Sequence, residues 1–236
     1  MEEIKQLKKI IDESKNIVFF GGAEVSTESG IKNFREKNRL YKIKTINKKP
    51  EYLLSTTCLY ENPKLFFDYY RKNLNYLDIK PNITHKYLKK LEDKGTLKAI
   101  ITQNIDGLHQ KAGSKNVIEL HGTIYNNHCT KCYKKYKENY IFDTKGIPKC
   151  ECGGTIRPDI ILYGEKSLDT YELAAYYIEK ADTLIIGGIS MQPASGLINL
   201  FTGKHLIIIN NEKTPYDKVA EIIINKPLGE IFTKLK

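Results

Sequence analysis

The stretch Asn16-Ile-Val-Phe-Phe-Gly-Gly-Ala23 contains four consecutive apolar residues followed by two glycines. A short apolar run without polar alternation is typical of a strand that is buried on both faces, and the glycines indicate a tight turn at its carboxyl end. Residues 1–14 precede this strand and place Ile4, Leu7 and Ile11 on one helical face. The chain is therefore predicted to begin with an amphipathic helix and a buried strand.

Three later stretches repeat the pattern of an apolar strand that ends in Gly or Asn, at 97–104, 183–188 and 205–210. Helical periodicity alternates with them at 85–93, 171–180 and 195–201. Strands that alternate with helices predict an α/β fold, in which a doubly wound parallel sheet carries helices on both faces. Ligands of such a fold bind at the carboxyl ends of the strands.

Two segments interrupt this alternation. Residues 38–76 are rich in Tyr, Phe and Lys and look helical from Pro63 onward, and residues 129–153 contain paired cysteines and many lysines. We interpret both as parts of a small lobe inserted into the sheet domain. The prediction is one domain over residues 1–236, with a large lobe at about 1–37, 77–128 and 154–236 and a small lobe at about 38–76 and 129–153.

Lysine supplies nearly all of the positive charge behind the net charge of +10, and arginine occurs only four times. Because specific contacts to bases and phosphates rely heavily on the arginine fork, we expect no specific nucleic-acid partner. No apolar run approaches the roughly 18 residues needed to span a bilayer, and the charged start lacks the apolar core of a signal peptide. We expect a cytoplasmic protein with no membrane partner.

Four of the five cysteines form two close pairs, Cys129-x-x-Cys132 and Cys150-x-Cys152, with 17 residues between the pairs. In a chain without an export signal, this spacing favours metal ligands over disulfides. Four thiolates fill all four positions of a tetrahedral Zn²⁺, so the predicted metal, one per chain, is structural. His128 is a weaker alternative ligand, and Cys58, which stands alone among apolar and aromatic residues, is predicted to lie in the core.

Three further segments place polar residues where apolar stretches end. Residues 22–35 begin with small residues, which lets backbone N–H groups approach a pyrophosphate, although an ordinary turn explains them equally well. Thr102-Gln-Asn-Ile-Asp106 directs polar groups into the ligand crevice, because a buried strand has no structural need for them. His121 suits proton transfer near neutral pH, but a lone histidine is more often a structural residue.

Several motifs follow one another in a fixed order along the chain. They are Ser26-x-x-Ser29-Gly30-Ile31-x-x-Phe34-Arg35, Thr102-Gln-Asn-Ile-Asp-Gly-Leu-His109, His121-Gly122, the four cysteines, Arg157-Pro158-Asp159-Ile160 with Tyr163-Gly164-Glu165, and Gly187-Gly188-x-Ser190. Together they resemble the sirtuin family over essentially the whole chain. The sequence around the second cysteine pair is most similar to that of the small bacterial sirtuins.

This resemblance implies a Rossmann-like sheet with a small zinc-and-helix lobe, and NAD consumed as a co-substrate. It implies that His121 is the general base and that Asn104 orients the ribose and a water. The positions that match the family's cofactor-binding residues are Gly22, Ala23, Ser26, Thr27, Phe34, Arg35, Gln103, Asn104, Ile105, Asp106, His121, Gly188, Ile189, Ser190, Asn210 and Leu228. Tyr163, Gly164 and Glu165 lie where the family pairs its backbone with an extended substrate peptide.

The activity that the resemblance implies is NAD-dependent deacylation of acyl-lysine proteins or peptides. The acyl oxygen attacks the ribose as nicotinamide leaves, and the acyl group ends on ADP-ribose. Two alternatives stay open: a degenerate ADP-ribosyltransferase or NAD hydrolase, and an inactive module that binds acyl-lysine or NAD. A hydride-transfer dehydrogenase on the same fold is a more remote alternative.

Three departures from the family pattern fall on the side that contacts NAD. Glu24 replaces the family's second glycine, Lys32-Asn33 replaces its Pro-Asp pair, and the stretch after Gly188 is shorter than usual. A carboxylate close to phosphate oxygens repels them. The sequence therefore predicts that Glu24→Gly tightens NAD binding several-fold, unless the carboxylate already points away from the phosphates.

Overall fold

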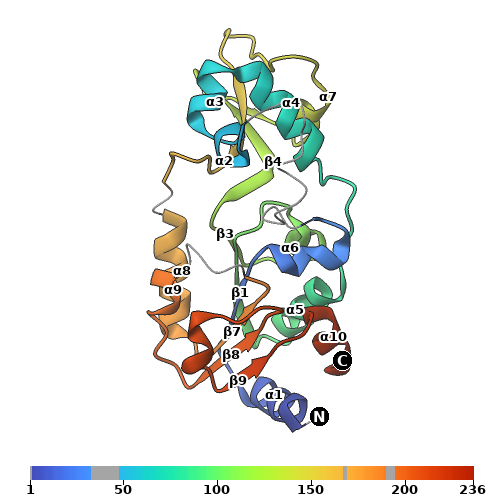
Figure 1. Ribbon diagram of the computed structural model, residues 1–236, viewed down its shortest axis with the longest axis vertical. Helices are drawn as coiled ribbons and strands as arrows, with labels where there is room; N and C mark the ends of the chain where they lie inside the picture. Colours follow the sequence, from blue (N-terminus) through green and yellow to red (C-terminus); the bar gives the residue numbers. More distant parts are fainter. Residues whose placement is uncertain (1, 33–47, 167–168, 190–194) are drawn as a thin grey trace.

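The computed structural model describes residues 2–32, 48–166, 169–189 and 195–236, and it has a large lobe and a small lobe stacked along the long axis (Figure 1). The amino-terminal helix α1 (Glu2–Glu13) lies at the free end of the large lobe, and the carboxyl terminus follows helix α10 (Leu228–Lys234) nearby. The small lobe occupies the opposite end of the molecule.

A six-stranded parallel sheet forms the large lobe. Its strands are β1 (Ile17–Gly21), β2 (Leu97–Thr102), β3 (Val117–Glu119), β7 (Thr183–Gly187), β8 (His205–Ile209) and β9 (Ile222–Ile224), in the order β3-β2-β1-β7-β8-β9. The chain builds outward from β1 to β3 on one side and from β7 to β9 on the other, so the order reverses between β1 and β7. Ligands of open α/β sheets bind at this switch point.

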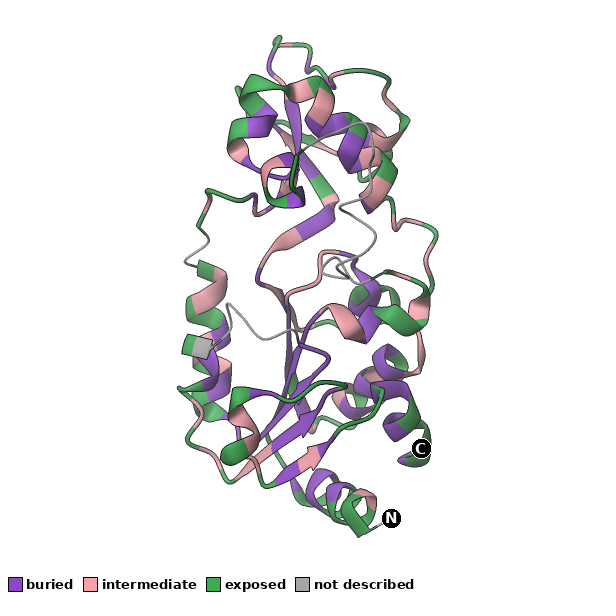
Figure 2. Cartoon of the chain, in the orientation of Figure 1, coloured by how far each residue is buried: buried purple, intermediate pink, exposed green. Residues whose placement is uncertain are grey.

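Helices cover both faces of the sheet, as the sequence predicts for a doubly wound fold. Helix α1, helix α5 (Ile83–Asp93) and α10 share one hydrophobic cluster with Phe19 of β1. Helices α8 (Asp169–Lys180) and α9 (Ser195–Ile198) share another with Val18 and Phe20. Successive side chains of a strand point to opposite faces, which is why a continuous apolar run serves both cores. Most of the sheet is buried in Figure 2, and every residue of β1 and β7 is buried.

The small lobe combines four short helices with a three-stranded antiparallel sheet. The helices are α2 (Pro50–Leu53), α3 (Thr56–Glu61), α4 (Pro63–Leu74) and α7 (Asn139–Asp143). The sheet has the order β5-β4-β6, from β5 (Lys135–Tyr136), β4 (Gly122–Cys129) and β6 (Ile156–Ile160). Its core draws on residues to either side of the predicted boundaries near 128 and 154, and the division into lobes stays a prediction.

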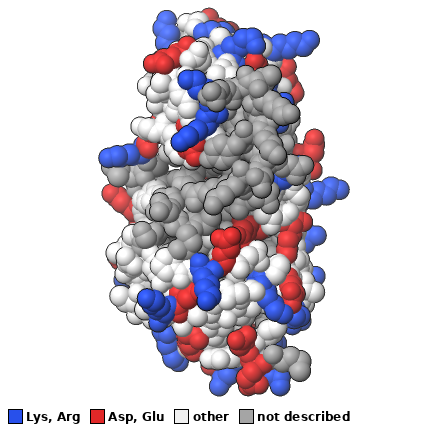
Figure 3. All heavy atoms as spheres, viewed as in Figure 1, with Lys and Arg blue, Asp and Glu red and all other residues white. Residues whose placement is uncertain are grey.

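The described residues also include the 3-10 helices η1 (Ala23–Ser29) and η3 (Pro215–Lys218) and the short helix α6 (Leu108–Lys111). Within the described part of the chain, no helix is both long and apolar enough to cross a bilayer. On the face drawn in Figure 3, lysines and arginines are interspersed with acidic side chains.

Candidate functional site

Two glycine turns meet at the switch point, one after β1 and one after β7. A Cβ atom on Gly22 would lie 2.8 Å from the carbonyl oxygen of Gly188, and one on Gly188, whose φ is +60°, would lie 2.8 Å from the amide of Val25. Any side chain at either position would therefore separate the turns. Ala23 and Ile189 follow these glycines, so the predicted cofactor-binding residues of both segments come together at this edge of the sheet.

The polar residues after β2 form a hydrogen-bonded network with Ser26 of η1. The amide of Asn104 donates to the carbonyl of Gly22 at 3.0 Å and to Ser26 Oγ at 3.1 Å. Ser26 Oγ donates to the Asp106 carboxylate at 2.7 Å, and the other carboxylate oxygen accepts from the amide of Leu108 at 2.9 Å. Burial raises the pKa of Asp106, and these bonds oppose the rise. The network fixes the orientation of Asn104 before any ligand arrives.

Gln103 and Ile105, between these residues, take part through their backbones. The amide of Gln103 donates to the carbonyl of Gly21 at 3.0 Å, and the carbonyl of Ile105 accepts from Ile124 at 3.1 Å. The Gln103 side-chain oxygen would lie 3.3 Å from a Cβ atom on Gly22. Gln103 therefore lies against the first glycine turn, while Ile105 anchors the loop to β4 of the small lobe.

His85 extends the network to the start of α5. It is wholly buried, and its Nε2 lies 3.5 Å from Ser26 Oγ. Its Nδ1 lies 3.3 Å from the amide of Asn82, the N-cap residue, which donates to it in a capping box. The same Nδ1 lies 3.0 Å from Asn82 Oδ1, so both ring nitrogens of His85 are within hydrogen-bond distance of polar partners. Burial lowers the pKa of His85 to about 4, so the neutral form dominates at pH 7.

We expect the stability of the protein to fall as the pH drops from 6.5 toward 4. The unfolded chain binds a proton at His85 near pH 6.5, whereas the folded chain resists until about pH 4. Protonation of His85 in the unfolded chain therefore lowers the stability of the fold by about 2 kcal/mol at pH 5 and by about 3 kcal/mol below pH 4, and has no effect well above pH 6.5. Urea unfolding of the wild type and His85→Gln at pH 7 and pH 5 measures this loss. Acid also releases zinc, but this affects the wild type and His85→Gln equally. An equal loss of unfolding free energy between pH 7 and pH 5 in the two proteins would exclude His85 as the cause.

His121 lies between the end of β3 and the start of β4, beside the network. Its Nδ1 is 3.0 Å from the backbone carbonyl of Gln103. Because a carbonyl only accepts, Nδ1 carries a proton, which leaves Nε2 as the ring nitrogen that can accept one. The next residue, Gly122, has a φ of +73°, and a Cβ atom there would lie 2.0 Å from the carbonyl oxygen of Asp159. The Gly122 turn thus allows β4 to leave directly after the histidine.

Glu119, His109 and His85 are titratable residues near the site to which the sequence analysis assigns no role. Burial raises the pKa of Glu119, two residues before His121, to about 7. His109 is 1% exposed and packs its ring 4.7 Å from that of His85, and burial, followed by this neighbour, lowers its pKa. His109 therefore lies in the core behind the network and not at the crevice. The sequence signal for His85 was its place three residues after Asn82, the spacing of a capping box.

A small pocket opens on the other side of the switch point, past the end of β8. Its lining residues are Glu24, Thr27, Glu28, Ile209, Asn210, Asn211, Lys226, Pro227 and Leu228. Three predicted cofactor-binding residues, Thr27, Asn210 and Leu228, meet here although they come from distant segments. Asn210 is 1% exposed, and its Oδ1 has no hydrogen-bond partner among the described residues. This buried acceptor fits a ligand that brings a donor. Phe34, Arg35 and Ser190 lie outside the described residues.

The segment Tyr163-Gly164-Glu165 joins the two lobes. The amide and carbonyl of Tyr163 bond to Leu54 and Thr56 at 3.0 and 3.1 Å, which makes a parallel bridge with the helical region of the small lobe. The Glu165 carboxylate forms a bidentate pair with Arg157 and accepts from the amide of Leu162 at 2.8 Å. Burial alone raises the pKa of Glu165, but the Arg157 and Leu162 bonds outweigh it and the net shift is downward. The Glu165 side chain therefore holds the loop in place.

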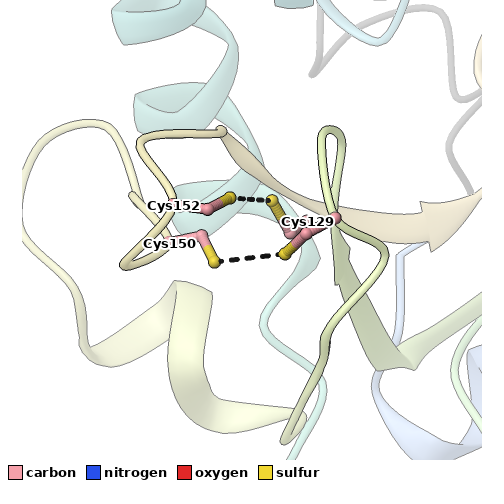
Figure 4. Close-up of side chains that lie close together, drawn as sticks. Cys129, Cys150 and Cys152 are labelled. Carbon is pink, nitrogen blue, oxygen red and sulfur yellow. Dashed lines mark hydrogen bonds between the residues drawn. The ribbon is translucent and has the colours of Figure 1, made fainter.

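Four cysteines converge at one end of the small lobe (Figure 4). The sulfur atoms of Cys129 and Cys152 are 3.5 Å apart, those of Cys132 and Cys150 are 3.6 Å apart, and all four lie within 4.8 Å of one another. These separations exceed a disulfide bond of about 2 Å. They match the edge of a tetrahedron with Zn–S bonds of about 2.3 Å, which is about 3.8 Å. The cysteines therefore fit a structural zinc ion.

The surroundings of the cysteines also suit a metal site. The amide of Lys131 donates to Cys129 Sγ at 3.3 Å, as expected of a thiolate acceptor. A Cβ atom on Gly154 would lie 2.5 Å from the same sulfur, so only glycine fits there. His128, the alternative ligand, is not in the sulfur cluster, because its Nδ1 pairs with the Asp159 carboxylate.

Comparison with known proteins gives a consistent result. A model of the Sir2 family matches residues 22–195. The chain is 50% identical over 240 residues to an NAD-dependent protein deacetylase of Clostridium perfringens, covering 99% of this chain and 98% of that one. It is 49% identical over 237 residues to an NAD-dependent protein deacetylase of Clostridium tetani, covering 98% and 96%.

Solved structures agree over the same length. A structure described as the basis of sirtuin substrate affinity has a TM-score of 0.88 and 35% identity, covering 98% of this chain and 97% of its own. A complex of Sir2 with a p53 peptide and NAD⁺ has a TM-score of 0.84 and 34% identity, covering 98% and 96%. The family model matches most of this chain, and the glycine turns, the strand-end network and the four-cysteine cluster are all present. This chain belongs to the Sir2 family.

Proposed function

We propose that this protein is an NAD-dependent protein-lysine deacetylase. The observation that carries the proposal is the orientation of His121, whose Nδ1–H donates to the Gln103 carbonyl at the ligand edge of the sheet. That arrangement presents a general base beside the Asn104 network, in a chain of the Sir2 family. Relatives at about half identity are named NAD-dependent protein deacetylases, which supports the same reaction here.

In this proposal, His121 takes a proton from a ribose hydroxyl through Nε2. NAD supplies the electrophilic ribose carbon that the acyl oxygen attacks as nicotinamide leaves. Asn104, held by Ser26 and Gly22, orients the ribose and a water, while Asp106 and Ile105 face the nicotinamide side. A base positioned for one proton typically contributes a rate factor of roughly a hundred or more. The Nδ1 bond of His121 prevents the ring from rotating out of line.

The substrate peptide is proposed to bind beside Gly164. Tyr163 directs its backbone groups to Leu54 and Thr56 of the small lobe. Gly164 follows with a φ of +98°, in a turn closed by a bond from the amide of Glu165 to the carbonyl of Leu162 at 2.9 Å, and we assign its backbone groups to an incoming strand. The pair between Arg157 and Glu165 holds this turn in place. An acyl-lysine on such a strand would enter the crevice between the lobes.

A cytoplasmic location stays a prediction.

Product analysis separates this proposal from its alternatives. We expect that NAD and an acetyl-lysine peptide, incubated with the protein and followed by mass spectrometry, yield nicotinamide, acetyl-ADP-ribose and the deacetylated peptide in equal amounts. An NAD hydrolase would release ADP-ribose with the peptide unchanged, and an ADP-ribosyltransferase would add ADP-ribose to the peptide. NADH would indicate a dehydrogenase. Binding without any product would indicate an inactive module, and each of these four outcomes contradicts the proposal.

A further inference from the structure

Glu24, which occupies a glycine position of the family pattern, directs its carboxylate toward the end of β8. The amide of Glu24 donates to the carbonyl of Gly188 at 3.1 Å, which places the residue between the two glycine turns. One carboxylate oxygen accepts from the Asn211 side chain at 2.9 Å. The side chain thus takes the orientation that the sequence left open as an alternative to repulsion of the phosphates.

The pocket past β8 gathers acceptors around this carboxylate. Glu24 and Asn210 both line it, and Oδ1 of Asn210 has no partner among the residues described while its Nδ2 donates to the carbonyl of Glu212 at 2.8 Å. Burial raises the pKa of Glu24, and the bonds from Asn211 oppose the rise. A partly desolvated carboxylate and a buried amide oxygen both require donors. A ligand with neutral O–H groups supplies them.

The charges of the pocket disfavour an anionic ligand group. Glu28 also lines it and is held against α10, since a Cβ atom on Gly229 would lie 2.0 Å from its Oε2. Lys226 is the cation among the lining residues, and its Nζ is paired with Glu230 at 3.0 Å. A phosphate monoester placed here would meet two carboxylates and one lysine, whose own partner Glu230 is shared with Lys234.

A vicinal diol matches this chemistry, because one carboxylate accepts hydrogen bonds from both hydroxyls. In dinucleotide-binding sheets an acidic residue about 20 positions after the glycine turn bonds to the 2′-hydroxyl of the adenosine ribose, and an arginine accommodates a 2′-phosphate instead. Glu24 offers the same carboxylate from within the turn. The two halves of a dinucleotide lie on either side of the switch point. His121 and Asn104, which are proposed to act on the nicotinamide half, lie on the side of β2 and β3. The pocket past β8, on the other side of the switch point, is therefore assigned to the adenosine half.

We propose that Glu24 determines dinucleotide specificity in this protein, by binding the ribose diol of the adenosine half of NAD and excluding dinucleotides with a 2′-phosphate. This inference rests on the proposed use of NAD. It reverses the expected effect of Glu24→Gly. The substitution removes an acceptor for the ribose, so it weakens the binding of the unphosphorylated ligand.

Calorimetric titration with ADP-ribose and with 2′-phospho-ADP-ribose tests the proposal, because neither ligand reacts. We expect the wild type to prefer ADP-ribose at least about a hundredfold, and Glu24→Gln to bind ADP-ribose roughly tenfold more weakly with a preference below about tenfold. Glu24→Gly is expected to show the same weaker binding of ADP-ribose and the same reduced preference. Glu212→Gln is the matched control, since it removes a nearby exposed carboxylate that does not line the pocket. Circular dichroism confirms that each variant is folded.

An unchanged preference in Glu24→Gln would overturn the inference and leave the proposed function intact. Tighter ADP-ribose binding by Glu24→Gly would also overturn it and would assign the residue to phosphate repulsion. An equal loss of preference in Glu212→Gln would trace the effect to net charge and exclude a local contact. A wild-type protein that binds neither ligand and forms no acetyl-ADP-ribose would overturn the proposed function and this inference together.

Discussion

Replacing His121 with alanine is expected to lower kcat for deacetylation at least about a hundredfold, with the fold unchanged. The His121 imidazole, oriented by the Gln103 carbonyl, is the base that the proposed reaction requires, and removal of one positioned base typically costs this much. His121 is partly exposed at the edge of the sheet, so its truncation opens no cavity in either core.

The measurement is steady-state release of nicotinamide in the presence of an acetyl-lysine peptide. Circular dichroism and thermal unfolding of the variant establish that the protein is folded. His205→Ala serves as the matched histidine control, because His205 begins β8 at the end of the strand away from the ligand edge. Near-wild-type turnover by a folded His121→Ala protein would show that another group is the base, and an equal loss in His205→Ala would show that the effect is not local.

Removal of zinc is expected to unfold the small lobe while the parallel sheet stays folded. The lobe has a core around Phe66, Phe67 and Tyr70, but the 129–153 segment that closes it is held by the four cysteines. Metal binding at structural four-ligand sites supplies about 10–16 kcal/mol of apparent free energy in isolated peptides. That free energy is comparable to the whole stability of a typical domain, about 5–15 kcal/mol.

Elemental analysis of protein purified without chelator is expected to give one zinc per chain. After chelation, hydrogen exchange is expected to rise in α7, β5 and the cysteine loops, and to stay low in β1, β7 and β8. Cys132→Ser should reproduce both effects. Cys58→Ala is the matched control, because Cys58 is buried in the same core but outside the sulfur cluster, so it should keep the metal. A zinc content near zero, or full protection after chelation, would contradict the assignment.

The sequence by itself predicted the parallel sheet, the helices on both faces and the metal ligands. Runs such as Ile17–Phe20 and Leu184–Ile186 are apolar at every position, which only a strand covered on both faces can bury. The spacing of the four cysteines limits the geometry so strongly that the sulfur cluster follows from it. Motif order likewise indicated the positions of Asn104 and His121. All of these signals are local in the chain, or depend on chemistry that tolerates few alternatives.

The tertiary structure alone decided which distant residues meet. Ser26 and His85 are 59 positions apart, and Glu24 and Asn211 are 187 apart. No periodicity shows that a carboxylate in the first glycine turn faces an asparagine past β8, or that Glu165 turns inward to Arg157. Each contact depends on the strand order and on how loops close over the sheet edge. The packing of the whole chain fixes both the strand order and the loop positions, because the free energy of burial is summed over many contacts that no single segment contains.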